Sequence, residues 1–173
     1  MSKTENKRLT KSREPEITGA KISDMAEILT LQQAAFQSEA LIHGDFTIQP
    51  LTQTLDEIIA EYNQSMVLKA VEDGEIVGSV RAHVEGDTVH IAKLIVHPEH
   101  QGKGLGRQLL AAIEEKFPQK RYELYTACKS DRNLHLYETA GYTPFRRETD
   151  HAGIAFVHLE KLKTETARAA QIS

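Results

Sequence analysis

The chain has 173 residues, which is long enough for one well-packed domain and short for two. Hydrophobic residues make up 40% and charged residues 27%, the balance of a soluble globular protein, and the short apolar runs exclude a membrane span. A net charge of −4 argues against a nucleic-acid partner, while the single cysteine, Cys128, excludes an internal disulfide and predicts a reducing, cytoplasmic location.

Both ends of the chain lack an apolar pattern that would reward burial. Residues 1–15 are polar and charged, without the apolar segment of a secretory signal, and we expect them to form a disordered tail. Residues 164–173 are expected to form a flexible tail. One domain is therefore predicted over residues 16–163.

The first half of this domain predicts one strand and two helices. Residues 16–21 fit a short strand, and Ser23 or Asp24 caps a helix with an apolar stripe. A polar loop separates this helix from a second one. The second helix starts either before Leu51, which continues its apolar stripe, or at Thr54, whose spacing to a glutamate three residues later fits a capping box. Both starts stay open.

The rest of the domain alternates strands and helices that are bounded by glycine or proline. The expected elements, in chain order, are strands 66–72, 75–84 and 88–96, helix 105–117, strand 121–127, helix 131–140, and strands 142–147 and 154–162. The Asp73-Gly74 dipeptide fits a tight hairpin turn, so the first three of these strands form an antiparallel meander.

The turn that leads into helix 105–117 contains three glycines, Gly102, Gly104 and Gly106. Glycines before a helix let the backbone approach a ligand closely, and the unpaired N–H groups and dipole of the helix favour an anion there. Lys103 and Arg107 add positive charge. We therefore expect a diphosphate ligand; the glycines alone would also suit a loop that merely turns tightly.

Two common phosphate-binding loops do not fit this segment. The dinucleotide fingerprint requires its third glycine where Arg107 stands, and it belongs to a βαβ unit rather than a meander. A Walker loop requires Ser or Thr after its lysine, whereas Gly104 follows Lys103. The anion is therefore expected to belong to another class of ligand.

Two motifs resemble those of the GNAT N-acetyltransferase superfamily. The run LIVHP at residues 94–98, followed by QGKGLG at residues 101–106, is similar to the acetyl-CoA-binding motif of that family. The run NLHLY at residues 133–137, followed by Gly141 and Tyr142, is similar to its second conserved region. The resemblance covers residues 16–163 and implies an α/β GNAT fold, with a mixed central sheet and helices on both faces.

The same resemblance implies a binding site for acetyl-CoA as cosubstrate. In the family, the strand before the glycine turn has a bulge, splays from its neighbour, and pairs with the pantetheine arm through its backbone. A main-chain N–H near Ile95 or Val96 would stabilise the oxyanion. Asn133 would contact the cofactor through its side chain, or would instead cap a helix. The expected cofactor-binding residues are Leu94, Ile95, Val96, Gln101, Gly102, Lys103, Gly104, Leu105, Gly106, Arg107 and Asn133.

The resemblance also implies catalytic roles. Tyr137 matches the tyrosine that protonates the departing thiolate, although its spacing also fits a core aromatic residue. His90 is the candidate general base, because it alternates with Ala92 and Leu94, unless a bulge breaks that alternation. A relay through water is the alternative. His83 and Glu85 are further polar residues just before His90, and Glu39, His43 and Asp45 are expected in a loop that borders the acceptor in the family.

The predicted function is the transfer of acetyl from acetyl-CoA directly to a primary amine of a small molecule. The alternatives are a protein N-terminal or lysine acetyltransferase and a non-catalytic acyl-CoA sensor. No metal is expected, because His97 and His100 lack a third ligand in the sequence. Cys128 lacks a recognisable base and is expected to line the core or the cleft. A homodimer that pairs an exposed strand near the C-terminus is the expected form of self-association.

Overall fold

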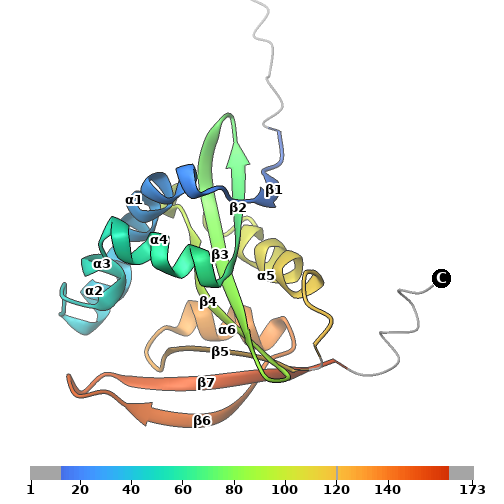
Figure 1. Cartoon of the computed structure of the whole chain (residues 1–173). Coiled ribbons are helices and arrows are strands. Elements are labelled where there is room, and N and C mark those ends of the chain that lie inside the picture. Colours follow the sequence, from blue (N-terminus) through green and yellow to red (C-terminus); the bar gives the residue numbers. More distant parts are fainter. Residues whose placement is uncertain (1–12, 120, 164–173) are drawn as a thin grey trace, which may run out of the picture.

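The computed structural model describes residues 13–119 and 121–163 (Figure 1). The tail predicted over residues 164–173, and residues 1–12 of the tail predicted over 1–15, lie outside this described part. Arg13, Glu14 and Pro15 are described, and they border a small pocket that also contains His100 and Lys103.

The described strands form a single seven-stranded sheet in the order β1-β2-β3-β4-β5-β7-β6. Its strands are β1 (Glu16–Gly19), β2 (Met66–Glu72), β3 (Glu75–Glu85), β4 (Thr88–Val96), β5 (Arg121–Ala127), β6 (Thr143–Thr149) and β7 (Ala155–Leu162). Neighbouring strands are antiparallel, apart from β4 and β5, which run parallel. The predicted mixed α/β sheet is confirmed, and its strand ends lie within two residues of the predicted ones.

Helices cover both faces of this sheet (Figure 1). One group consists of α1 (Met25–Ala35), α2 (Gln37–His43), α3 (Gln49–Thr52) and α4 (Leu55–Gln64). Of these, α1 and α4 pack on β2, β3 and β4, and α2 and α3 contact α1. The opposite face carries α5 (Leu105–Glu115) and α6 (Asp131–Thr139). Two short 3-10 turns, η1 (Ile22–Asp24) and η2 (Pro98–His100), precede α1 and α5.

The segment between α1 and α4 differs from the predicted polar loop. It contains two short helices, α2 and α3, and in α2 only Ala40 is buried, so no apolar stripe announces the helix. The open choice of start for α4 resolves at Thr54. The Glu57 N–H donates to Thr54 Oγ1 (3.2 Å) and the Thr54 N–H donates to Glu57 Oε2 (2.7 Å), a complete capping box. Leu51 lies in α3 instead.

The core between the sheet and α5 is almost entirely apolar. The buried stripe of α5 is Leu105, Leu109, Leu110 and Ile113, with exposed fractions of 4% or less. Full burial of such a side chain stabilises the fold by about 1.5–3 kcal/mol relative to exposure. This stripe therefore fixes where the first turn of α5 lies relative to β3 and β4.

An irregularity in β4 reverses the faces of its side chains. Lys93 has φ 52°, a left-handed conformation that is unusual for a lysine. Arg81 pairs with Ala92 and Ser79 pairs with Ile95, so three steps along β4 lie opposite two along β3, which is a β-bulge. The bulge breaks the alternation expected from His90 to Leu94, because Leu94 packs with the α5-side core.

The parallel strands β4 and β5 pair only at their beginnings. The pairs are Thr88 with Arg121, Val89 with Tyr122, and His90 with Glu123. Beyond His90 the two strands diverge, so the last residues of β4 keep a backbone edge that β5 does not cover. This divergence opens the sheet next to the glycine turn.

A cleft between the diverging strands

A cleft of about 360 Å³ lies where β4 diverges from β5, between the α1–α2 junction, the glycine turn and α6. Its walls include ten of the eleven predicted cofactor-binding residues: Leu94, Ile95, Val96, Gln101, Gly102, Gly104, Leu105, Gly106, Arg107 and Asn133. Lys103 lines the small neighbouring pocket instead. Their roles in binding stay predictions, but the fold gathers them around one cavity.

The glycine turn forms an open anion cradle at the start of α5. Gly102 and Gly104 have φ values of 77° and 84°, and a Cβ added to either would meet no atom within 4 Å. The first helical hydrogen bond runs from the Gln108 N–H to the Gly104 C=O (3.1 Å). The N–H groups of residues 105–107 therefore have no helical partner and can donate to an anion. The charge and geometry fit a pyrophosphate.

Two polar side chains brace the walls of the cleft. Gln101 donates from Nε2 to the Val96 C=O (3.1 Å) and accepts a hydrogen bond from Arg132, so it ties the end of β4 to α6. Asn133 donates from Nδ2 to Thr126 Oγ1 on β5 (3.3 Å). The helix-capping role considered for Asn133 is therefore not the contact that its side chain makes here.

Tyr137 lies on α6, one turn after Asn133, and is 6% exposed. Its ring packs edge-on against Tyr142 at 6.2 Å, so it does contribute to the core. Burial, and secondly the carboxylate of Glu39, raise the pKa of the Tyr137 phenol above its ordinary value. A phenol with a raised pKa keeps its proton at neutral pH, which is what a proton donor requires.

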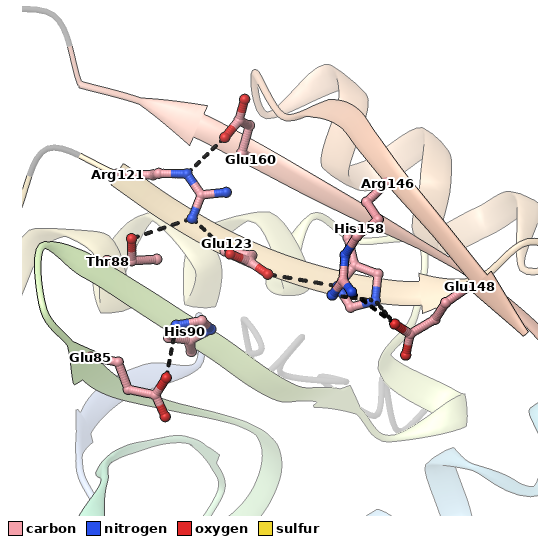
Figure 2. A network of polar contacts seen from close by, with 9 residues as sticks. All are labelled: Glu85, Thr88, His90, Arg121, Glu123, Arg146, Glu148, His158 and Glu160. Carbon is pink, nitrogen blue, oxygen red and sulfur yellow. Dashed lines mark hydrogen bonds and ion pairs between the residues drawn. The ribbon is translucent and has the colours of Figure 1, made fainter. Parts of the chain in front are cut away.

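His90 does not line this cleft. It lies where β4 and β5 are still paired, and its ring stacks on His83 at 5.2 Å. Its Nε2 lies 3.6 Å from Glu85 (Figure 2). Its side chain belongs to the sheet face opposite α5, together with Glu123 across the strand pair. The prediction that His90 is the base therefore has no support from its position.

Beside His90, a polar network runs from Thr88 on β4 across β5, β7 and β6 (Figure 2). Arg121 donates to Glu160 and to Glu123, at 2.7 Å each. His158 lies 3.7 Å from Glu123 and 3.5 Å from Glu148. Burial alone would raise the pKa of Glu123, but the hydrogen bond from Arg121 lowers it overall. These contacts bind three strands together and are distinct from the cleft.

Glu39 is a cleft residue that the sequence placed only in a loop bordering the acceptor. The helix α2 brings its side chain into the lining of the cleft, where it accepts a hydrogen bond from Ser130 Oγ (2.6 Å). His43, one turn later on α2, lies 3.7 Å from the same carboxylate. Asp45 instead accepts hydrogen bonds from Thr47 in the following turn.

The α1–α4 side of the cleft is rich in buried polar groups. Arg81 is 2% exposed and donates to Glu61 (2.5 Å) and Gln32 (2.6 Å). Lys93, at the bulge, hydrogen-bonds Gln49, and its Nζ lies 5.7 Å from the ring centre of Phe36, which lines the cleft. Burial lowers the pKa of Lys93 to about 8.

Outside the cleft, the described residues offer another hollow with few titratable side chains and no metal-binding cluster. A hollow of about 480 Å³ lies between the end of α4 and Phe117, and among the described residues that line it only Tyr62 and His83 are titratable. Within residues 13–119 and 121–163, no three His, Cys, Asp or Glu side chains group as metal ligands. His100 pairs with Glu72 at 2.5 Å.

In the same described ranges, no helix has the length and apolar character needed to span a membrane.

Comparisons with known proteins agree with this geometry. Residues 32–163 match the family model described as an acetyltransferase (GNAT) domain. The chain is 31% identical over 84 residues to glucosamine 6-phosphate N-acetyltransferase of Schizosaccharomyces pombe. The aligned region covers 44% of this chain and 75% of that protein. It is 28% identical over 117 residues to the UPF0157 protein YqkA of Bacillus subtilis, which covers 67% of this chain. It spans only 34% of the length of YqkA.

A solved structure shares the fold. The structure of YncA from Salmonella typhimurium, described as a putative acetyltransferase with its cofactor acetyl-CoA, superposes with a TM-score of 0.70. The two chains are 21% identical, and the match covers 88% of this chain and 96% of YncA.

Proposed function

Because the chain belongs to the GNAT acetyltransferase family, we propose that it transfers the acetyl group of acetyl-CoA to a primary amine of a small molecule. The observation that carries this proposal is the cleft of about 360 Å³, in which an anion-binding helix start and an unpaired strand edge meet. A diphosphate and an extended amide-bearing arm are the two ligand features that these groups would recognise.

The residues of the cleft divide the work of binding acetyl-CoA. The N–H groups of residues 105–107, with Arg107, hold the pyrophosphate. The free edge of β4 at residues 94–96 pairs with the amides of the pantetheine arm. A main-chain N–H of Ile95 or Val96 donates to the thioester oxygen as negative charge develops on it during attack by the amine.

Tyr137 supplies the proton for the departing thiolate in this proposal. Its raised pKa means that the phenol is protonated over the whole neutral range. Asn133, one turn earlier on α6, lines the cleft, whereas Tyr137 belongs to the buried core behind that helix, so the proposed proton donation comes from the core side of the cleft wall. Proton donation of this kind typically contributes 10²–10⁴-fold to the rate.

The acceptor is proposed to be a small amine because the related yeast enzyme is named for glucosamine 6-phosphate. Only the class of acceptor is extended to this chain. The opening between α2 and β4 is lined by Phe36 and Glu39, which offer an apolar surface and a carboxylate to an aliphatic ammonium group. An acceptor that is a protein tail, and a sensor without catalysis, are the two alternatives.

Release of CoA thiol across an amine panel tests the proposal. The panel contains glucosamine 6-phosphate, polyamines, aminoglycosides, amino acids and short peptides. We expect at least one small amine to raise thiol release about 10²-fold or more above the buffer rate. Faster reaction with peptides would indicate a protein acetyltransferase. Tight binding of acetyl-CoA without thiol release from any amine would indicate a sensor and would contradict the proposal.

We also propose a cytoplasmic location and a homodimer for this enzyme. A single cysteine fits the reducing conditions of the cytoplasm. The edge strand β6 is exposed along its whole length, and its unpaired backbone could join a second copy as a homodimer.

A further inference from the structure

Glu39 is a carboxylate that is held inside the cleft. Its side chain is 17% exposed and lines the same cavity as residues 94–96 and Asn133. It also lies close enough to Tyr137 for its charge to raise the pKa of that phenol. A carboxylate that lines the cleft therefore lies near a buried phenol, a pairing that suits a base and an acid.

The contact with Ser130 is made at the expense of a helix cap. Ser130 occupies the N-cap position of α6, where serine normally accepts a hydrogen bond from the helix backbone, but its side chain makes no such bond. Its hydroxyl donates instead to Glu39 Oε1 (2.6 Å), 91 residues away in sequence. One oxygen of the carboxylate is thereby fixed, while Oε2 is left for another partner.

His43 flanks that second oxygen. Its side chain is 8% exposed, and Nε2 lies 3.7 Å from Glu39 Oε2. Among the residues that the structure describes, this buried Nε2 has no hydrogen-bond partner. A buried ring nitrogen without a partner is unfavourable unless a ligand or solvent completes it. The imidazole of His43 therefore turns its Nε2 toward the second oxygen of the Glu39 carboxylate.

We propose that Glu39 is the general base for the acceptor amine, with Ser130 and His43 as the residues that position it. This inference rests on the proposed function and adds a residue that the two sequence motifs do not contain. It replaces His90, which lies outside the cleft beside Glu85.

In the proposed reaction, two protons leave the acceptor nitrogen and one proton is added to the thiolate. The ammonium group of the acceptor gives one proton to Glu39, which passes it to solvent. The free amine forms a C–N bond with the thioester carbonyl, the C–S bond breaks, and the thiolate takes the phenol proton of Tyr137. The nitrogen then loses its second proton, and uptake of a proton by the tyrosinate regenerates the phenol of Tyr137. In sum, the ammonium and acetyl-CoA give the acetylated amine, CoA thiol and one proton.

Glu39→Gln separates the role of a base from that of a structural contact. The glutamine oxygen can still accept the hydrogen bond from Ser130, but it cannot take a proton. With the fastest acceptor of the amine panel, we expect kcat/KM to fall by about 10² or more, and affinity for acetyl-CoA to stay within about twofold. Glu39→Asp, which retains a carboxylate, should recover part of the rate. Ser130→Ala removes the hydrogen bond alone and should cost less than about tenfold.

The pH profile gives a readout that a structural role would not change. In Glu39→Gln, only acceptor that is already deprotonated can react, so the rate should rise tenfold per pH unit up to the pKa of the amine, more steeply than in the wild type. Unchanged activity of Glu39→Gln, or an equal loss in Ser130→Ala with an unaltered profile, would overturn the role of Glu39 while leaving the proposed function standing. Absence of thiol release by the wild type would contradict both.

Discussion

The two faces of the sheet around the cleft are held together by different kinds of contact. On the α5 face the contacts are mainly apolar, with Glu114 as a buried exception, and the glycine turn offers backbone N–H groups to a ligand. On the α1–α4 face, a smaller apolar cluster is accompanied by a hydrogen-bonded chain of the buried Arg81, Gln32 and Gln53 with the partly exposed Glu61. Backbone groups and apolar packing shape the proposed cofactor side of the cleft, whereas the side chains of Phe36 and Glu39 line the proposed acceptor side.

This difference has a functional consequence. Backbone donors and glycine conformations recognise a diphosphate in the same way whichever side chains surround them. Side chains such as Phe36 and Glu39, which line the proposed acceptor side, can instead be altered one residue at a time to suit another amine. The cofactor side can therefore be identified from a short motif, whereas the acceptor side cannot.

The largest effect is expected from a side chain placed in the anion cradle. Gly104→Glu puts a carboxylate where the pyrophosphate is proposed to lie, and it should weaken CoA binding by about 10²-fold or more in calorimetry. Gly86→Glu is the matched control, because Gly86 also has a positive φ (58°) and open space, but it lies in the β3–β4 turn. Both variants should lose about 1–2 kcal/mol of folding stability. Equal CoA affinity in the two would remove the cradle from the site.

Tyr137→Phe should have the next largest effect. Loss of the phenol proton is expected to lower kcat by about 10²-fold, with little change in affinity for acetyl-CoA. Tyr142→Phe is its control in the same core, since the Tyr142 hydroxyl donates to the buried Glu114 at 2.6 Å. That variant should lose about 1–3 kcal/mol of stability and keep its kcat. Full activity of Tyr137→Phe would restrict Tyr137 to packing.

The smallest expected effect concerns Lys93 on the polar face. Its pKa is about 8 in the folded chain and 10.5 ordinarily, so between these pH values the unfolded chain binds more protons. Stability should therefore rise with pH over this window. Lys93→Met should be about 1–2 kcal/mol more stable than the wild type at pH 7, with the gain vanishing near pH 10.5.

Urea unfolding from pH 7 to 10.5 measures this difference. The exposed Lys103 provides the control, since Lys103→Met should not flatten the dependence of stability on pH. A wild type and a Lys93→Met variant with parallel profiles would show that burial of Lys93 is not a cost to the fold.

The sequence was sufficient where its signals are local. The strand ends, the capping box at Thr54 and the glycine turn each depend on a few neighbouring residues, and the structure contains all three. It was insufficient for α2, in which only Ala40 is buried and no apolar stripe marks the helix. The resemblance implied a bulge in β4, which the structure contains, but its position at Lys93 was hidden because no glycine marks the residue with positive φ.

The choice of His90 as the base illustrates the remaining gap. Strand alternation relates His90 to Leu94, but the extra residue at the bulge sends the two side chains to opposite faces. The contact of Glu39 with Ser130 joins positions 91 residues apart, and neither residue belongs to a motif. Contacts of this kind follow from how the helices pack on the sheet, which local patterns do not encode.

A crystal structure of the chain with acetyl-CoA would show directly whether the cofactor occupies the cleft beside the glycine turn. We expect the pyrophosphate against the N–H groups of residues 105–107, and the pantetheine arm along β4 at residues 94–96. We also expect the thioester in the cleft between Glu39 and Tyr137. Acetyl-CoA bound away from the glycine turn, or with its thioester on the open face beside His90 and Glu123, would contradict it.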